Sequence, residues 1–394
     1  MQKLKLSRGK ILNIYPGTGT STTTGWNPVS TGVNGFVFSI AQDMSTNLVY
    51  AGGKFSTAGG LSAGRIASWN GSSWAYLGGG VSLSFLPANT AVNAIAVASD
   101  GKVYVGGLFD TAGGAGGFSN LAVWNPATST WSNMGGGANG EVYSIAVSGS
   151  DVYVGGLFTS VGTGGGTVAA NRIAKWNGSV WSALGSGTDT GVNAIAISGS
   201  NVYAGGSFVT AGGVAANRIA VWNGSAWSAL GTGLNGLCRA IAIGSGNDIY
   251  IGGNFNTAGG VSAIGIAKYN TGTSTYSSIG NLLASGATDG VTYGMYFISG
   301  NLYVCGNFVS AGGTTTTNFA IYNGTSWSTL PGVTFDSVSW TIRVDNNSNI
   351  YVGGEFTSPQ AYITIYGQTT VAGSSTAAVG RDTKNFSKRI GLRF

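Results

Sequence analysis

The chain has 394 residues, of which 70 are Gly, 8% are charged and none is His, and its net charge is +6. The absence of His excludes Ser-His-Asp and Cys-His catalytic sites and the commonest zinc ligand. The sequence contains no run of about 18 apolar residues, the length that a membrane-spanning helix needs. The many aromatic, Val, Ile and Thr residues favour an all-β protein over a helical or α/β enzyme.

Residues 1–20 are predicted to form a basic N-terminal arm. Their longest apolar run, about five residues, is shorter than the apolar segment of a secretory signal, so we expect no export by that route. The cations of this arm are Lys3, Lys5, Arg8 and Lys10.

Residues 21–31 are predicted to form a β-strand that resembles part of a later repeat. The stretch TGWNPVSTGVNG, residues 24–35, aligns with SAWSALGTGLNG, residues 225–236. The alignment places Trp26 in register with Trp227.

A repeat of about 50 residues fills the body of the chain. Its motif, Tyr-x-(Gly/Cys)-Gly, returns at intervals of 47 to 54 residues, at Tyr50, Tyr104, Tyr153, Tyr203, Tyr250, Tyr303 and Tyr351. In the fourth repeat, the segments 192–198, 201–208, 217–224 and 226–233 each have the pattern of a strand, and turn residues separate them. A self-similar unit of four strands predicts a solenoid or a propeller.

Aromatic residues keep one position in the third strand of the repeat and one in the fourth. The third-strand residues are Trp69, Trp124, Trp176, Trp222, Tyr269, Tyr322 and Tyr366. The fourth-strand residues are Trp74, Trp131, Trp181, Trp227, Tyr276 and Trp327. We expect these rings to be buried between neighbouring sheets; an exposed platform for sugars or bases is the alternative.

The seventh repeat lacks its fourth strand, because the segment QTTVAGSSTAAVG after residue 367 contains no Trp. The strand of residues 21–31 supplies the missing one, with Trp26 against Tyr366, and so closes the ring. The predicted fold is therefore an all-β, seven-bladed β-propeller over residues 21–367, with four antiparallel strands per blade. The blades are expected near residues 32–80, 91–137, 138–187, 189–233, 234–285, 290–331 and 333–367, and residues 368–394 are predicted to form a basic C-terminal arm.

A resemblance to known repeats supports this fold. The stretch FVTAGGVAANRIAVWNGSAWSALGTGLNG, residues 208–236, resembles the propeller repeats of bacterial surface proteins, fungal cortical cell-polarity markers and giant-virus proteins, which are loosely related to kelch and galactose-oxidase propellers. The resemblance covers about residues 21–367 and implies a binding or structural module. A copper-radical oxidase of the galactose-oxidase kind needs His ligands, which this chain lacks.

No catalytic, cofactor or metal site is predicted, and we expect the protein not to be an enzyme. Asp151 and Asp248 stand at the turn before the second strand, where other repeats have Asn, and are interpreted as turn residues. The Gly-rich segments 113–117 and 162–166 lack the Lys of a phosphate-binding loop. Calcium bound by loop Asp residues is left open. Cys238 and Cys305 are predicted to be buried free thiols.

Half of the basic residues lie at the two ends of the chain, whereas the body holds nine bases and eleven acids. The final segment, NFSKRIGLRF, alternates cations with apolar side chains. We therefore predict that both ends anchor the protein to a protein partner rather than to nucleic acid; two solvated tails are the alternative. The predicted anchoring residues of the C-terminal arm are Arg381, Lys384, Phe386, Lys388, Arg389, Arg393 and Phe394.

These features leave three classes of function. The favoured one is a structural or surface-display propeller of a larger assembly, on the surface of a virion or other capsid-like particle. The alternative is a soluble or cell-surface module that binds a glycan or a protein on a propeller face and reaches the outside of the cell by a route other than Sec. A hydrolase or lyase that acts through carboxylates and Tyr is the least favoured.

Overall fold

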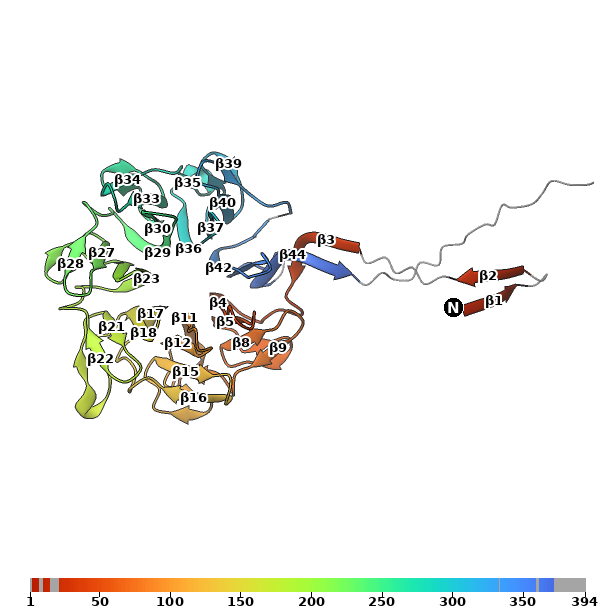
Figure 1. Ribbon diagram of the computed structural model, residues 1–394, viewed down its shortest axis with the longest axis horizontal. Helices are drawn as coiled ribbons and strands as arrows, with labels where there is room; N and C mark the ends of the chain where they lie inside the picture. The colour runs from red at the N-terminus through yellow and green to blue at the C-terminus, as the bar shows by residue number, and fades with distance from the viewer. Residues whose placement is uncertain (1, 7–9, 15–20, 333, 359–360, 372–394) are drawn as a thin grey trace, which may run out of the picture. The chain divides into compact units, whose positions relative to one another are not determined.

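The computed structural model describes residues 2–6, 10–14, 21–332, 334–358 and 361–371 (Figure 1). The chain divides into two compact units, residues 26–367 and the two ends, residues 1–25 with 368–394. In the second of these, β1 (Gln2–Leu6) pairs antiparallel with β2 (Lys10–Ile14). The described residues contain no α-helix, and their three helical turns are of the 3-10 type: η1 (Pro87–Asn89), η2 (Gly164–Gly166) and η3 (Ser285–Ala287). The expected all-β class is confirmed.

Seven four-stranded antiparallel sheets contain most of the described strand residues. Their inner strands are β4 (Val37–Gln42), β11 (Ala91–Val97), β17 (Val142–Ser148), β23 (Val192–Ser198), β29 (Leu237–Ile243), β36 (Val291–Ile298) and β42 (Ser339–Val344). The second strands are β5 (Val49–Gly53), β12 (Val103–Leu108), β18 (Asp151–Gly156), β24 (Asn201–Gly206), β30 (Asp248–Asn254), β37 (Asn301–Asn307) and β43 (Ile350–Gly354). Figure 1 shows the inner strands gathered around a common centre, as expected of a β-propeller.

The third and fourth strands complete each sheet toward its outer edge. The third strands are β8 (Ile66–Trp69), β15 (Leu121–Asn125), β21 (Ile173–Trp176), β27 (Ile219–Trp222), β33 (Ile266–Asn270), β40 (Phe319–Tyr322) and β44 (Ile363–Val371). The fourth strands are β9 (Trp74–Tyr76), β16 (Thr130–Asn133), β22 (Trp181–Ala183), β28 (Trp227–Ala229), β34 (Thr275–Ser277), β41 (Trp327–Ser328) and β3 (Ser21–Pro28).

A short hairpin, not predicted from the sequence, follows the second strand of most repeats. In the fourth repeat it joins β25 (Thr210–Ala211) to β26 (Val214–Ala215). Its two turn residues, Gly212 and Gly213, have φ of +60° and +79°, which Gly adopts without steric cost and which suits a two-residue hairpin turn. The Ala-Gly-Gly segment of residues 211–213 therefore forms the tip of an additional hairpin, and not a simple loop between the second and third strands.

The repeated Tyr-x-Gly-Gly motif allows neighbouring sheets to approach closely. A Cβ added at Gly106 would lie 2.6 Å from Val142 Cγ1 of the next sheet, and one at Gly353 would lie 2.6 Å from Val37 Cγ1. Such distances are far below van der Waals contact, so only Gly fits opposite these valines. Buried apolar clusters fill each interface between neighbouring sheets. Cys238 and Cys305 lie within them as fully buried free thiols, as predicted.

The aromatic residues of the third and fourth strands pair within each sheet, and in six of the seven sheets the fourth-strand residue also donates a hydrogen bond to a carbonyl of the repeat before it, whereas Trp26 Nε1 has no such partner among the described residues. The rings of Trp222 and Trp227 have centroids 5.7 Å apart, and Trp227 Nε1 donates a hydrogen bond to Leu184 O at 2.7 Å. Where the fourth-strand residue is Tyr276, its hydroxyl donates to Leu230 O instead. The equivalent bonds elsewhere are Trp74 to Val29, Trp131 to Leu77, Trp181 to Met134 and Trp327 to Ile279.

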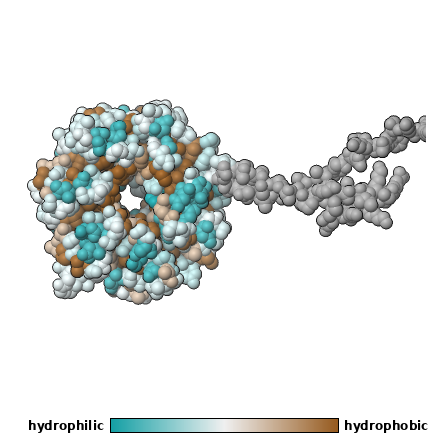
Figure 2. Space-filling view, in the orientation of Figure 1, coloured by the Kyte–Doolittle hydropathy of each residue, from teal (hydrophilic) through white to brown (hydrophobic). Residues whose placement is uncertain are grey.

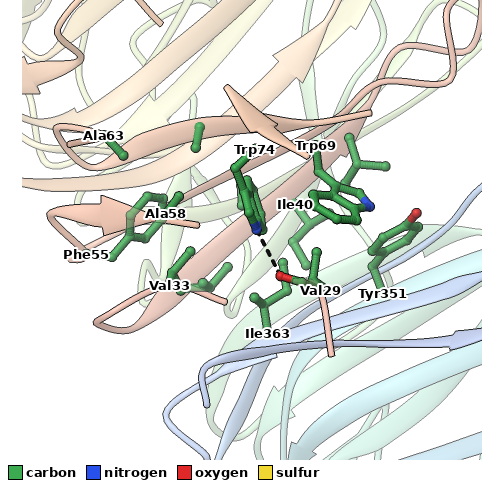
Figure 3. Close-up of a cluster of buried hydrophobic side chains, with 14 residues drawn as sticks. Val29, Val33, Ile40, Phe55, Ala58, Ala63, Trp69, Trp74, Tyr351 and Ile363 are labelled. Carbon is green, nitrogen blue, oxygen red and sulfur yellow. Dashed lines mark hydrogen bonds between the residues drawn. The ribbon is translucent and has the colours of Figure 1, made fainter. Parts of the chain in front are cut away.

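The sheet that contains both β3 and β44 has the strand order β3-β44-β43-β42. Thr364 Oγ1 donates to Asn27 O at 3.0 Å, and the ring centroids of Trp26 and Tyr366 are 5.3 Å apart. Figure 3 shows the residues that follow β3 in one cluster with the first and last repeats, where Trp74 donates to the carbonyl of Val29. Between the inner strands β42 and β4, Ile40 N donates to Thr341 Oγ1 at 3.1 Å.

Candidate binding site at the centre of the sheets

Every inner strand carries a β-bulge at the same position of the repeat. The pairing of β11 with β12, for example, shifts register between Val92 and Ala94 and leaves Asn93 without a partner across the ladder. The seven bulged residues are Phe38, Asn93, Tyr143, Asn193, Arg239, Tyr293 and Trp340. A bulge bends the strand and turns its extra side chain away from the regular alternation.

All seven bulged residues line a single cavity of about 430 Å³, here called the central pocket. Phe36, Lys54 and Glu355 complete its lining. Figure 2 shows an opening at the centre of the sheets formed by residues 26–367. A cavity of this size falls within the range of small-ligand sites.

One side of the central pocket is an aromatic wall formed by Phe36, Phe38, Trp340 and Tyr293. The ring centroids of Tyr293 and Trp340 are 4.2 Å apart at an interplanar angle of 52°, and those of Phe38 and Trp340 are 5.8 Å apart at 84°. The ring centroids of Phe36 and Phe38 are 6.4 Å apart. The wall is therefore curved, because its neighbouring rings are tilted against one another.

Two cations lie against this wall. The guanidinium carbon of Arg239 is 5.0 Å from the ring centroid of Tyr293, and Lys54 Nζ is 6.0 Å from that of Phe38. The ion pairs among the described residues are Lys102–Asp100, Lys175–Asp151 and Lys268–Asp248, so neither cation is paired with a carboxylate there. Within the same described residues, the buried Nε of Arg239 and Nε1 of Trp340 have no hydrogen-bond partner.

Polar side chains of other sheets face the same space. Asn93 Nδ2 donates to Glu141 Oε1 at 2.8 Å and to Val142 O at 3.1 Å, so its amide hydrogens are used and its Oδ1 is the remaining acceptor. The Tyr143 hydroxyl donates to Glu141 Oε2 at 3.2 Å. Burial, together with the Glu141 carboxylate, raises the pKa of Tyr143 to about 12, so this phenol is neutral at physiological pH.

The bulged residues were not predicted as a site from the sequence. The signal was present in the repeat alignment: the position before the bulge is Val in four of the seven inner strands, whereas the bulged position holds five different residue types. A repeat that keeps small residues on both sides of one variable position indicates that packing does not determine the residue there. The bulge that turns these side chains to the centre was not visible in the sequence, because a bulge arises only when two strands pair.

The predicted anchoring residues fall at the two ends of the chain. Lys3 and Lys5 fall in β1 and Lys10 in β2, but their side chains lie outside the described residues, as does Arg8. Arg381, Lys384, Phe386, Lys388, Arg389, Arg393 and Phe394 also lie outside the described residues. Their anchoring role stays a prediction.

The described residues contain neither a candidate metal site nor a candidate membrane-spanning helix. Among them, no three His, Cys, Asp or Glu side chains are grouped so that they could hold a metal ion. No helix in this part of the chain has the length and apolar character needed to cross a membrane.

The fold is similar to that of several solved structures. The extracellular domain of the putative one-component system BT4673 from B. thetaiotaomicron matches 87% of this chain with a TM-score of 0.56 and 12% identity, and this chain covers 40% of that domain's chain. A chain of the Mitotic Checkpoint Complex matches 93% with a TM-score of 0.55 and 11% identity, over 96% of its own length. The computationally designed protein Ika8 matches 85% with a TM-score of 0.51 and 14% identity, over 97% of its length.

Sequence comparison identifies the family. No curated protein matches the chain. Two adjoining stretches, residues 81–175 and 175–281, each match the Rax2 C-terminal beta propeller domain, and together they make up just over half of the 394 residues. The chain therefore belongs to the family of Rax2 C-terminal beta propeller domains.

Proposed function

We propose that this protein is a non-enzymatic binding module, a seven-bladed propeller closed by β3, and that its ligand binds in the central pocket. The observation that carries the proposal is that one bulged residue from each of the seven inner strands lines the same cavity. These residues differ in chemistry while their neighbours in the strand stay small, as expected when one position serves recognition and the others serve packing. A distant relationship to kelch and galactose-oxidase propellers is part of the same proposal.

Closure of the ring is supported by a contact between the first and last sheets that recurs at other interfaces, and by an aromatic pair within the last sheet. The close approach of Gly353 to Val37 has the same geometry as that of Gly106 to Val142. The pairing of Trp26 with Tyr366 at 5.3 Å likewise matches the pairing of Trp124 with Trp131 at 5.2 Å.

The binding site is tested by comparing two aromatic substitutions in the full chain. Screening on glycan and peptide arrays supplies the ligands, and Trp340→Ala should weaken binding of the ligands found by about tenfold or more, because an aromatic anchor in a pocket carries a large share of binding energy. Tyr76→Ala, at an aromatic residue of β9 that is 59% exposed and outside the pocket, should leave binding unchanged. Ligands that bind both variants as tightly as the unaltered protein would refute the proposed site.

A surface location accompanies this proposal. One of the similar structures is an extracellular domain and another belongs to a multiprotein complex, both of which suit a propeller that binds partners. We place the protein on the surface of a cell or of a particle such as a virion. Surface labelling of intact cells or particles with a membrane-impermeant reagent tests this location, because an internal protein would not be labelled.

A role in a larger assembly, anchored by the basic ends, is the second candidate. The observation that favours it is the charge distribution, with nine of the 18 basic residues in residues 3–10 and 381–393. Removing residues 1–12 and 380–394 should leave a folded propeller that no longer joins its assembly. Normal incorporation of the truncated protein would refute anchoring by the ends without affecting the central pocket.

A further inference from the structure

We infer that the central pocket binds an acidic carbohydrate, a pyranose ring that carries a carboxylate. This inference rests on the proposed function, because it assumes that the pocket is the ligand site. It deepens that proposal by naming the class of ligand that the lining would recognise.

The shape of the aromatic wall favours a sugar over a flat aromatic ligand. Tyr293, Trp340 and Phe38 meet at interplanar angles of 52° and 84°, so these neighbouring rings offer no parallel pair between which a base could be sandwiched. A pyranose ring needs only one aromatic face for its C–H groups and polar partners around its edge. The wall supplies such faces on one side of the pocket.

The remaining lining supplies the polar partners. Asn93 Oδ1 is held as an acceptor because the amide hydrogens of Asn93 are engaged by Glu141 and Val142. Asn193 and Glu355 also line the pocket, on the inner strand β23 and directly after β43. Amides and carboxylates around a ring edge match hydroxyl groups, which both donate and accept hydrogen bonds.

The charges favour an acidic sugar over a neutral one. Two cations, Arg239 and Lys54, line the pocket with one carboxylate, Glu355, and neither cation has an ion pair among the described residues. The Arg239 guanidinium lies over Tyr293, next to Trp340 in the aromatic wall. A guanidinium has the planar donor geometry that matches a carboxylate, so a sugar that stacks on the wall would bring its carboxylate to Arg239.

Calorimetric titration of the full chain with matched sugars tests the inference. The probes are methyl glucuronide and methyl galacturonide, each compared with the neutral methyl hexoside that differs only at C6. We expect at least one uronide to bind about tenfold or more tightly than its neutral counterpart, since a hydrogen bond to a charged group is worth more than one to a neutral group. Raised salt should weaken uronide binding and leave hexoside binding unchanged.

Substitutions assign the preference to named residues. Arg239→Gln should reduce the ratio of uronide to hexoside affinity to about one while weak hexoside binding remains, and Trp340→Ala should weaken both by about tenfold or more. Arg218→Gln makes the same change outside the pocket and should leave the ratio unaltered. Asn193→Ala, which removes no ring from the aromatic wall, provides a second pocket variant and should weaken both sugars. Thermal melting confirms that each variant is folded.

The outcomes separate this inference from the proposed function. Equal binding of uronides and hexosides, or tighter binding of uridine monophosphate than of any uronide, would overturn the acidic-sugar inference. If peptides found on an array bind only when Trp340 is present and no sugar binds, the ligand class is wrong and the pocket proposal stands. Uronide binding that survives Trp340→Ala and Asn193→Ala would refute both.

Discussion

The residues at the interfaces between sheets change little from repeat to repeat, whereas the residues that line the central pocket differ. The same repeat builds both regions. At the interfaces, Gly stands opposite Val in sheet after sheet, as in the pairs Gly106 with Val142 and Gly155 with Val192. At the bulge, one residue further along the inner strand, the side chain ranges from Asn to Arg to Trp. A repeat can therefore hold its packing constant and still vary the chemistry of a site.

The physical difference lies in what each side chain meets. A residue at an interface touches the neighbouring sheet at close-packed density, so a change of one methyl group requires a compensating change opposite. The sixth repeat illustrates this, because Cys305 replaces the first Gly of the motif and the next inner strand begins with the small Ser339 rather than Val. The bulged side chains face a cavity, where no neighbouring sheet restricts their size.

The largest effect is expected at the sheet that joins the two ends of the propeller unit. Trp26 contacts the rings of Phe319, Phe335 and Tyr366, with centroids 5.3 to 5.8 Å away. Trp26→Ala should lower the free energy of unfolding by about 3–5 kcal/mol, the usual cost of removing a large packed aromatic side chain. Chemical denaturation measures this loss, and an unchanged midpoint would show that β3 does not close the ring.

A smaller effect is expected where Gly allows close approach. Gly106→Ala places a methyl group 2.6 Å from Val142 Cγ1 and should cost about 1–3 kcal/mol by overpacking. Gly116→Ala is the matched control, because no atom lies within 4 Å of the added Cβ there. Adding Val142→Ser to Gly106→Ala reproduces the small partner found opposite Cys305 and should recover part of the loss in thermal melting. Equal stability of the two alanine variants would contradict the packing argument.

The contribution of the interfaces to the free energy of unfolding should also depend on pH, but only at alkaline pH. Burial raises the pKa of Cys238 from an ordinary value of 9.0 to about 12, so above pH 9.0 the unfolded chain releases this proton while the folded chain keeps it. The contribution of this thiol to the free energy of unfolding is therefore fully present below pH 9.0. It is lost between pH 9.0 and about 12, at about 1.4 kcal/mol per pH unit.

Melting temperatures measured from pH 5 to pH 11 test this expectation. Cys238→Val, which restores the Val found at this position in other inner strands, should make the alkaline decline shallower. Between pH 5 and pH 8 the curve should be nearly flat, because the chain has no His. A steep change near pH 6 would contradict this.

The smallest effect on stability is expected inside the central pocket. Asn193 is a partly buried bulged residue, and Asn193→Ala should change the free energy of unfolding by less than about 0.5 kcal/mol. The same substitution should weaken ligand binding, so stability and binding respond separately at this position. Strong destabilisation by Asn193→Ala would remove the distinction between packing and recognition positions.

The sequence was sufficient to predict the parts of the fold that rest on local pattern. Alternating apolar residues predicted an inner strand over residues 192–198, and β23 has the same bounds. The third and fourth strands are shorter than predicted, at Ile219–Trp222 and Trp227–Ala229, because the flanking residues form the turns. The alignment of Trp26 with Trp227 rested on the same periodicity, and the structure places Trp26 in one sheet with Tyr366.

The all-β class, the unit of four strands, the paired aromatic positions and the buried thiols could be predicted from the sequence, because they follow from residue patterns that recur along the chain. The place where the variable side chains meet depends on the tertiary structure. A bulge is a mismatch in register between two strands, so it appears only when both strands are paired. Convergence of seven such side chains on one cavity further requires seven sheets around a common centre. Phe38 and Trp340 therefore lie 5.8 Å apart although some 300 residues separate them in the chain.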